Sequence, residues 1–239
     1  MRTWLKLVFC FGIVCGLAFI IYFYRIETSK QETDMNTNEP SPKITNDNPS
    51  QTDERMRNKT IVIDAGHGGT DTGAISTSGV FEKDLTYETA SLLKKILTTI
   101  GADVIMTREH DDYITLATRA NLANMNETDA FISIHYNSVQ ELPEVTGIST
   151  FYYDKANKQL AEVVQTNIIG ETKANDRGIS FADFQVLRDN IKPAILLELG
   201  FLSNQETEQK LLDKNYQQLM VDGITKGLLT FFSKEHATD

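Results

Sequence analysis

Two histidines follow short apolar runs, a position from which imidazole groups can hold a metal ion. His67 comes shortly after the run at residues 61–63, and His135 ends the run at residues 131–134. Such runs, rich in β-branched residues and followed by glycine or asparagine, are typical of buried strands that end in a turn. Ligands bind an open parallel sheet beyond the carboxyl ends of its strands, so both imidazoles are expected at one crevice. A buried zinc ion would suit them.

A carboxylate lies inside a third apolar run. Glu198 stands within residues 193–201, between leucines on either side. An unpaired carboxylate in such a place would cost several kcal/mol or take up a proton, and a raised pKa is what a general base near neutral pH requires. The alternative interpretation is a buried salt bridge with Arg177 or Arg188.

Four separated blocks occur in an order that matches a known family. They are DAGHGG at residues 64–69, FEKD at 81–84, SIHYN at 133–137 and LELGFLSN at 197–204. With these blocks, residues 60–232 resemble the zinc-dependent N-acetylmuramoyl-L-alanine amidases. The resemblance implies that His67, Glu82 and His135 hold one Zn²⁺ ion and that Glu198 is catalytic. It also implies peptidoglycan as the substrate and, as the scissile bond, the amide between the lactyl group of N-acetylmuramic acid and L-alanine.

Each of these residue types also has a plainer interpretation. A single strand-end histidine is more often a hydrogen-bonding loop residue, and Glu82 fits the charged first turn of a helix, where carboxylates suit the helix dipole. Asn137 could steer substrate or hold its own loop, Arg177 could meet a carboxylate of the peptide stem, and Arg119 is expected to form a structural ion pair.

Two other functions stay open: a zinc peptidase acting on stem peptides, and a catalytically silent protein that binds peptidoglycan or recruits a partner.

Strand and helix patterns alternate through the part of the chain that carries these residues. Apolar residues at helical spacing predict helices near residues 85–100, 116–125, 156–170 and 216–232. Short apolar runs predict strands at 61–63, 103–106, 131–134, 147–153, 184–187 and 194–197, of which 147–153 is expected at an edge. Ser203 and Glu206 have the spacing of a capping box that opens a further helix.

This alternation predicts the fold class. Parallel strands need crossover connections, so the chain is expected to form an α/β fold: a mainly parallel, twisted sheet of about six strands with helices on both faces. The α/β/α sandwich implied by the resemblance agrees with it.

The N-terminal part of the chain has a different composition. Residues 7–24 contain no charged side chain and as a helix would span roughly 27 Å, close to the ~30 Å hydrocarbon core of a membrane. We therefore expect a membrane anchor at residues 1–25, a disordered polar linker at 26–57 and the catalytic domain at 58–239. The expected location is the cell membrane, crossed once, with the catalytic domain outside; the alternative is secretion after cleavage of a signal peptide.

The net charge and the positions of the cysteines exclude one class of partner and one kind of cross-link. The formal net charge is −10, which provides no basic field for phosphate backbones, so no nucleic-acid partner is expected. Both cysteines, Cys10 and Cys15, lie in the apolar segment, so the remaining chain forms no internal disulfide bond.

Peptidoglycan and the cytoplasmic membrane, through residues 7–24, are the expected partners. The sequence implies no protein activator. The short anchored architecture also resembles a sporulation amidase that acts on the spore cortex.

Overall fold

The structure, a computed structural model, describes residues 52–235, which contain one six-stranded sheet in the order β2-β1-β3-β6-β4-β5. The strands are β1 (Thr60–Ala65), β2 (Asp103–Met106), β3 (Ala130–Asn137), β4 (Ile148–Tyr152), β5 (Asp176–Phe181) and β6 (Ala194–Phe201). The helices are α2 (Glu82–Thr99), α3 (Leu116–Met125), α4 (Lys158–Thr172), α5 (Gln185–Arg188), α6 (Gln205–Leu212) and α7 (Lys214–Glu235), with a 3-10 turn η1 (Lys155–Asn157) before α4.

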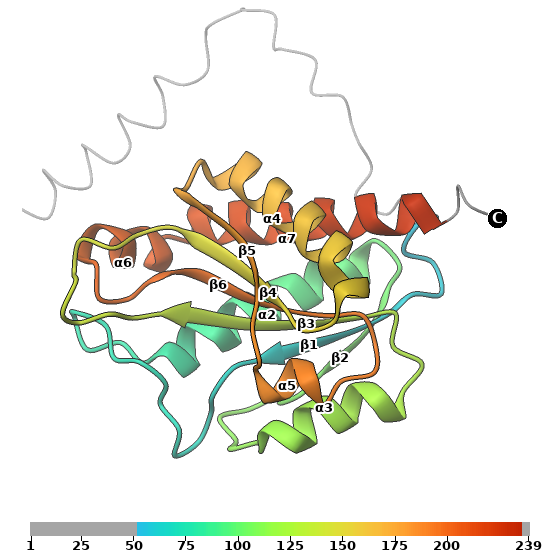
Figure 1. Cartoon of the computed structure of the whole chain (residues 1–239), viewed down its shortest axis with the longest axis horizontal. Coiled ribbons are helices and arrows are strands. Elements are labelled where there is room, and N and C mark those ends of the chain that lie inside the picture. Colours follow the sequence, from blue (N-terminus) through green and yellow to red (C-terminus); the bar gives the residue numbers. More distant parts are fainter. Residues whose placement is uncertain (1–51, 236–239) are drawn as a thin grey trace, which may run out of the picture. The chain divides into compact units, whose positions relative to one another are not determined.

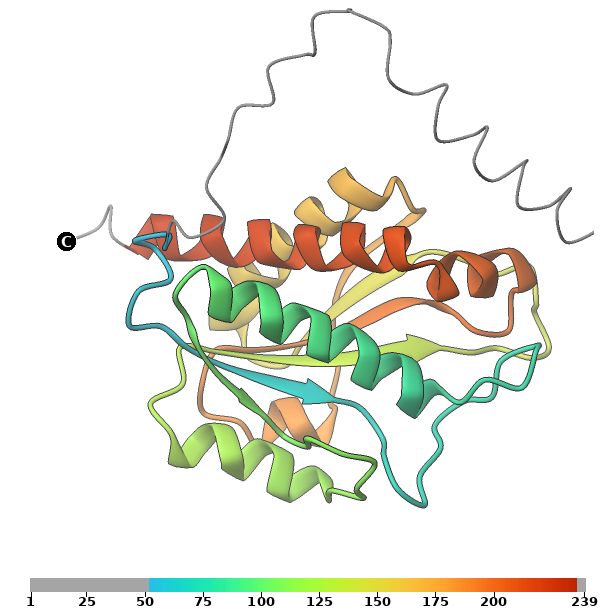
Figure 2. The same ribbon diagram turned by 180° about the vertical axis from the view of Figure 1, so that it is seen from behind.

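The sheet is mainly parallel. Strands β2, β1, β3 and β6 run in one direction, β4 pairs with β6 in the opposite direction, and β5 runs parallel to β4. Helices cover both faces: α4 and α7 lie above the sheet in Figure 1, and α3 and α5 lie below it. Seen from behind in Figure 2, α2 packs beside α7 on the upper face. The predicted α/β class is confirmed.

The prediction of the sheet edge was wrong. β4 was expected at the edge, but β5 pairs with it on its outer side. β5 has no apolar run of the kind that marks a buried strand, since Arg177 and Phe181 are exposed and Gly178 interrupts the strand. An edge strand buries little of its surface, so its sequence carries little of the signal from which buried strands are recognised.

The predicted strand at residues 184–187 was also wrong, because this segment forms the short helix α5. Val186 and Leu187 are both buried and both pack in the cluster that also contains Phe131 and Leu196. Successive side chains of a strand point to opposite faces, so two adjacent residues buried on one side favour a helical turn. The periodicity of so short an apolar run does not show whether it forms a buried strand or a buried helix.

The cap of α6 lies one residue later than predicted. The side chain of Asn204, rather than that of Ser203, accepts a hydrogen bond from the Thr207 amide at 2.8 Å. The Ser203 hydroxyl instead accepts from the Val139 amide at 2.9 Å. Ser203 thereby ties the segment after β6 to the segment after β3.

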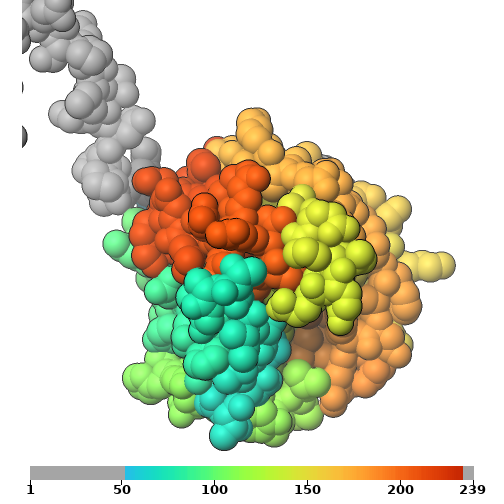
Figure 3. All heavy atoms as spheres, turned by 90° about the vertical axis from the view of Figure 1, so that its left-hand side faces the viewer, coloured from blue at the N-terminus to red at the C-terminus, as the bar shows by residue number. Residues whose placement is uncertain are grey.

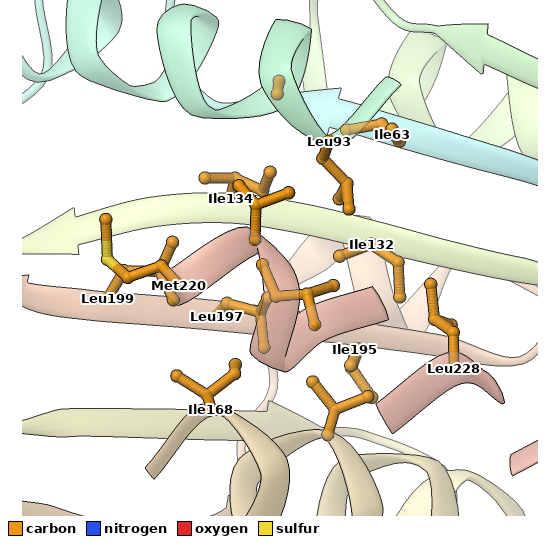
Figure 4. Packing of buried hydrophobic residues seen from close by; sticks show 14 of the residues in the cluster. Ile63, Leu93, Ile132, Ile134, Ile168, Ile195, Leu197, Leu199, Met220 and Leu228 are labelled. Carbon is orange, nitrogen blue, oxygen red and sulfur yellow. The ribbon is translucent and has the colours of Figure 1, made fainter. Parts of the chain in front are cut away.

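The larger core lies between the sheet and helices α2, α4 and α7. Figure 4 shows Ile132 and Ile134 of β3 and Ile195 and Leu197 of β6 packing there, with Leu93 of α2, Ile168 of α4 and Met220 and Leu228 of α7. A smaller cluster on the other face contains residues of β1, α3, β3, α5 and β6.

The alternation of these core residues sets the direction of the polar ones. Because Ile134 and Leu197 point into the larger core, the next residues along the two strands, His135 and Glu198, point to the face that carries α3 and α5. Both side chains therefore lie on one face, near the carboxyl ends of neighbouring strands.

The structure does not support the predicted single-pass membrane location. Between residues 52 and 235, no helix is long and apolar enough to cross a membrane. The longest helices there, α2 and α7, carry charged residues along their length and bury only one face against the sheet. Residues 7–24, from which the membrane span was predicted, lie outside the described residues.

Candidate active site

Three side chains from separate elements converge where β1 and β3 end. His67 follows β1, Glu82 is the first residue of α2, and His135 lies near the end of β3. Glu82 Oε1 is 3.1 Å from His67 Nε2 and 3.1 Å from His135 Nδ1. Figure 3 shows this end of the sheet, where the surface is hollowed between the segments that follow β1 and β3. The structure thus brings together the three residues predicted as metal ligands.

Glycines make room for this convergence. A Cβ atom on Gly66 would lie 2.4 Å from His135 Cε1 and 2.5 Å from its Nε2. A Cβ on Gly73 would lie 2.6 Å from Glu82 Oε2 and 2.7 Å from His67 Cδ2. Neither contact is tolerable, so only glycine lets the backbone approach the three side chains this closely. His67 itself has a left-handed backbone, with φ at 60°.

The carboxylate of Glu82 is held by backbone amides. Its Oε2 accepts from the Ala74 amide at 2.9 Å, and its Oε1 accepts from the Tyr136 amide at 3.0 Å. Only 4% of Glu82 is exposed. Glu82 does lie in the charged first turn of a helix, as its plainer interpretation has it, and its side chain turns inward to the two histidines.

The donor set fits a metal ion. Two imidazole nitrogens and one carboxylate oxygen lie within 4.8 Å of one another. Burial opposes protonation of His67, but Glu82 and Asp71 outweigh it and raise the pKa of His67 to about 9 in the metal-free arrangement. Burial likewise disfavours the charged form of Glu82, yet hydrogen bonds from both histidines hold its pKa well below the usual range. A cation between these groups would take the place of the protons.

Glu198 lies beside this group. Its Cα is paired with that of His135 across the β3 and β6 ladder. Glu198 Oε2 is buried and has no hydrogen-bond partner among the described residues. Burial, with Glu82 nearby, raises the pKa of Glu198 to about 7 against the opposing charges of the two histidines. A carboxyl group with such a pKa can exchange a proton at neutral pH.

The alternative of a salt bridge to Glu198 finds no support in these contacts. Arg188 pairs with Asp183 at 2.7 Å and approaches Asp189 at 3.4 Å. Arg177 lies with its guanidinium 5.1 Å from the ring centroid of Phe201 and donates to the Thr146 carbonyl at 3.4 Å.

The two residues predicted to bind substrate have different surroundings. Asn137 Oδ1 accepts from the Ser138 amide at 2.8 Å, and its carbonyl accepts from the Leu202 amide at 2.8 Å, so Asn137 holds its own loop. Arg177 stands at the start of β5 and is exposed. The start of β4 pairs with the start of β5 on one side and with the end of β6 on the other, so Arg177 lies at the same end of the sheet as Glu198.

Residues that the sequence did not single out complete the surroundings of the site. Asp71 Oδ2 lies 2.9 Å from His67 Nδ1, the ring nitrogen that faces away from Glu82. Arg108 donates to the carbonyls of Ala65 at 3.0 Å and Gly66 at 3.1 Å. The contact between Asp71 and His67 could have been found from their spacing, since the two residues lie four positions apart around glycines. No local pattern indicated the hydrogen bonds of Arg108 to the Ala65 and Gly66 carbonyls.

The fold and this site define an enzyme of the hydrolase class with side chains that could bind a metal ion. The chain belongs to the N-acetylmuramoyl-L-alanine amidase family, whose family model matches residues 61–230. The resemblance seen in the four sequence blocks is thereby confirmed.

Relatives agree with this assignment. The chain is 40% identical over 74% of its length to the putative N-acetylmuramoyl-L-alanine amidase YrvJ of Bacillus subtilis. It is 37% identical over 83% of its length to the probable cell wall amidase LytH of Staphylococcus epidermidis. The matching parts make up 34% of YrvJ and 65% of that LytH, so these relatives contain regions with no counterpart in the aligned part of this chain.

Two solved amidases share the fold over nearly their whole length. The N-acetylmuramoyl-L-alanine amidase from Clostridium difficile 630 superposes with a TM-score of 0.72 and 39% identity, covering 74% of this chain and 98% of that one. The CwlD amidase from Clostridioides difficile, solved in complex with the GerS lipoprotein, gives a TM-score of 0.71 and 31% identity, covering 74% and 100%.

Proposed function

We propose that this chain hydrolyses the amide bond between the lactyl group of N-acetylmuramic acid and L-alanine in peptidoglycan, with one zinc ion held by His67, Glu82 and His135. The observation that carries the proposal is the convergence of these three donors within 4.8 Å, next to a carboxylate oxygen of Glu198 that has no hydrogen-bond partner in residues 52–235. The family supports the same reaction. We further propose residues 58–239 as the catalytic domain.

The donor types favour zinc. Two imidazoles and one carboxylate are a ligand set found in catalytic zinc sites, which leave one coordination position open. When bound, zinc supplies Lewis acidity that lowers the pKa of water and polarises a carbonyl group. Asp71 would orient His67 by accepting from Nδ1, since metal-binding histidines usually donate their other ring N–H to a carboxylate or carbonyl.

Glu198 is the proposed general base and acid. It accepts a proton from the attacking water and then donates that proton to the leaving nitrogen, because an amide anion is too basic to leave unprotonated. In the metal-free arrangement the pKa of Glu198 is about 7, so the carboxyl group can exchange a proton at neutral pH, and the charge of a bound zinc ion would favour the carboxylate form that accepts the first proton. Glu198 Oε2 has no hydrogen bond to any of the described residues that would have to break before it acts.

Arg177 is the proposed contact for a carboxylate of the peptide stem. Its guanidinium is exposed at the end of the sheet where the candidate active site lies. Its hydrogen bond to the Thr146 carbonyl is long, at 3.4 Å. A substrate carboxylate would provide a stronger, charge-assisted partner. Asn137 holds the loop after β3 through its side-chain oxygen, which accepts from the Ser138 amide, and its Nδ2 group is the proposed donor to substrate.

The test compares the 239-residue chain with its Glu198→Gln variant on purified peptidoglycan, with zinc content measured in both. We expect the wild type to create new L-alanine N-termini and the variant to retain zinc but lose at least a hundredfold in rate, the usual contribution of a positioned general base. Release of free D-amino acids instead would favour a zinc peptidase. Bound zinc with no product from the wild type would favour a silent binding protein or a missing activator.

A second protein could activate this chain, as a separate question from the reaction itself. The relative CwlD was solved with the GerS lipoprotein, and an activator of this chain would appear as activity that depends on an added protein. The role in sporulation stays a prediction from the sequence resemblance.

A further inference from the structure

A buried arginine lies behind the loop that carries His67. Arg119 of α3 donates from Nη1 to the Ala65 carbonyl at 2.7 Å and from Nη2 to the His67 carbonyl at 2.6 Å. Its Nε donates to the Ile114 carbonyl at 3.0 Å, and its Nη1 also meets Asp64 Oδ1 at 2.7 Å. One guanidinium thus spans the last residues of β1 and the candidate metal ligand itself.

The carboxylate that pairs with Arg119 links the two strands that carry the histidines. Asp64 Oδ2 accepts from the Ser133 hydroxyl at 2.7 Å, and its Oδ1 accepts from the Thr107 hydroxyl at 2.7 Å. Ser133 stands two residues before His135 on the same face of β3. Asp64 therefore joins the end of β1 to β3 just below the point where both histidines emerge.

The ion pair between Arg119 and Asp64 is almost completely withdrawn from water. The side chain of Arg119 is 3% exposed and that of Asp64 is 0% exposed. Replacing a buried ion pair by apolar side chains is often neutral or stabilising, so the pair is weakly explained as a device for stability alone. A role in holding one particular backbone conformation accounts for it better.

The backbone of His67 is the feature that needs such support. A φ of 60° is uncommon for any residue other than glycine. Arg108 caps the carbonyls of Ala65 and Gly66, but among the described residues Arg119 alone donates to the His67 carbonyl. The planar fork of a guanidinium can hold several acceptors in fixed positions, which an ammonium group cannot.

We propose that Arg119 is a positioning residue for metal binding: it holds His67 in the left-handed backbone conformation that aims Nε2 toward Glu82 and His135. The inference rests on the proposed zinc site. Loss of Arg119 leaves the three ligands present but frees the His67 carbonyl, so the ligand set is no longer held in place before the metal arrives.

The test measures zinc affinity by competition with a chromophoric chelator, together with unfolding of the metal-free chain. In Arg119→Lys a cation remains beside Asp64, but a single ammonium cannot reproduce the fork to Ala65 and His67. We expect zinc binding to weaken at least tenfold, the usual effect of removing a group that orients a metal ligand. The control is Leu228→Ala in α7, which removes a core side chain on the other face of the sheet. It should lower stability and leave zinc affinity within about twofold.

A second variant separates the positioning of His67 by Arg119 from the effect of leaving the buried charge of Asp64 unpaired. The double variant Asp64→Asn with Arg119→Met removes both buried charges, so its metal-free stability should exceed that of Arg119→Met alone, while zinc binding stays at least tenfold weakened. Zinc affinity that recovers together with stability would overturn the inference, as would wild-type affinity in Arg119→Lys. Failure of the wild type itself to bind zinc would overturn the proposed metal site as well, so the two failures are distinguishable.

Discussion

His135 and Glu198 lie directly opposite each other in the parallel pairing of β3 and β6, and immediately beyond them the register shifts, so that Asn137 pairs with Phe201. The proposed metal ligand and the proposed proton carrier are therefore held by adjacent backbone strands rather than by loops. Their relative position is fixed by ladder hydrogen bonds and by the core beneath Ile134 and Leu197. Four consequences of this arrangement and its surroundings are testable.

The burial of Glu198 should appear as a pH-dependent loss of stability. Its pKa in the fold, about 7, exceeds the value of 4.5 for a free glutamate, so the fold binds this proton more tightly than the unfolded chain does. The stabilisation is fully present below pH 4.5 and is lost as pH rises through 7. Above that pH, metal-free Glu198→Gln should be more stable than the wild type by on the order of 3 kcal/mol.

Denaturant unfolding of both proteins with a chelator, from pH 4 to pH 9, measures this difference. The difference should shrink toward zero at the acidic end, where Glu198 is protonated in both states. An equal stability difference at all pH values would show that glutamine acts through packing rather than through charge.

Gly66→Ala should displace His135 and weaken metal binding. The added Cβ would lie 2.4 Å from the imidazole ring, and the ring has no freedom to retreat without leaving Glu82. We expect a zinc affinity at least tenfold lower and a stability loss of about 1–3 kcal/mol from overpacking. The matched control is Gly170→Ala in α4, where a Cβ meets nothing within 4 Å. It should raise stability by up to about 1 kcal/mol and leave zinc affinity unchanged.

Zinc affinity should depend on pH through His67. In the metal-free arrangement its pKa is about 9, so at neutral pH zinc must displace a proton from this ring. Between pH 6 and pH 8 the dissociation constant should fall by about tenfold for each pH unit, since one proton is released. Chelator competition at several pH values gives the slope. His110→Ala, which removes an exposed histidine, should show the same slope, and a flat profile for the wild type would contradict the assignment of His67.

Glu208 of α6 should stabilise the loop between the first two ligands. Its carboxylate accepts hydrogen bonds from the Thr77 and Ser78 hydroxyls and from the Ser78 amide, the last at 3.1 Å. Burial disfavours its charge, but hydrogen bonds from Ser76 and these two residues lower its pKa to about 2. The stabilisation is therefore present above pH 4.5 and is lost as pH falls toward 2.

Glu208→Ala should cost about 1–3 kcal/mol of unfolding free energy at pH 7, because the loop donors lose a charged acceptor. Hydrogen exchange at the Ser78 amide should accelerate in the same variant. Glu206→Ala is the control, since Glu206 is exposed and pairs only with Lys210 among the described residues. No measurable change is expected there, and equal effects of the two substitutions would contradict the anchoring role of Glu208.

Local patterns determined much of this protein. The apolar runs before His67 and His135 and the run around Glu198 identified three central strands, because buried strands must be apolar on both faces. Helical spacing identified α2, α3, α4 and α7 for the corresponding reason, that each buries one stripe against the sheet. The candidate site residues came from the order of the four sequence blocks and from the family that these blocks resemble, and the structure brings His67, Glu82 and His135 together.

Only the tertiary structure decided how these parts meet. The edge position of β5, the helical form of α5 and the inward turn of Glu82 depend on contacts between residues far apart in the chain, which local spacing does not encode. The same holds for Arg119, which the sequence indicated as an ion-pair residue and which the fold places on the carbonyl of His67. A sequence records which side chains are available and which faces must be buried, while the bonds that orient a ligand arise only when separate strands and helices pack side by side.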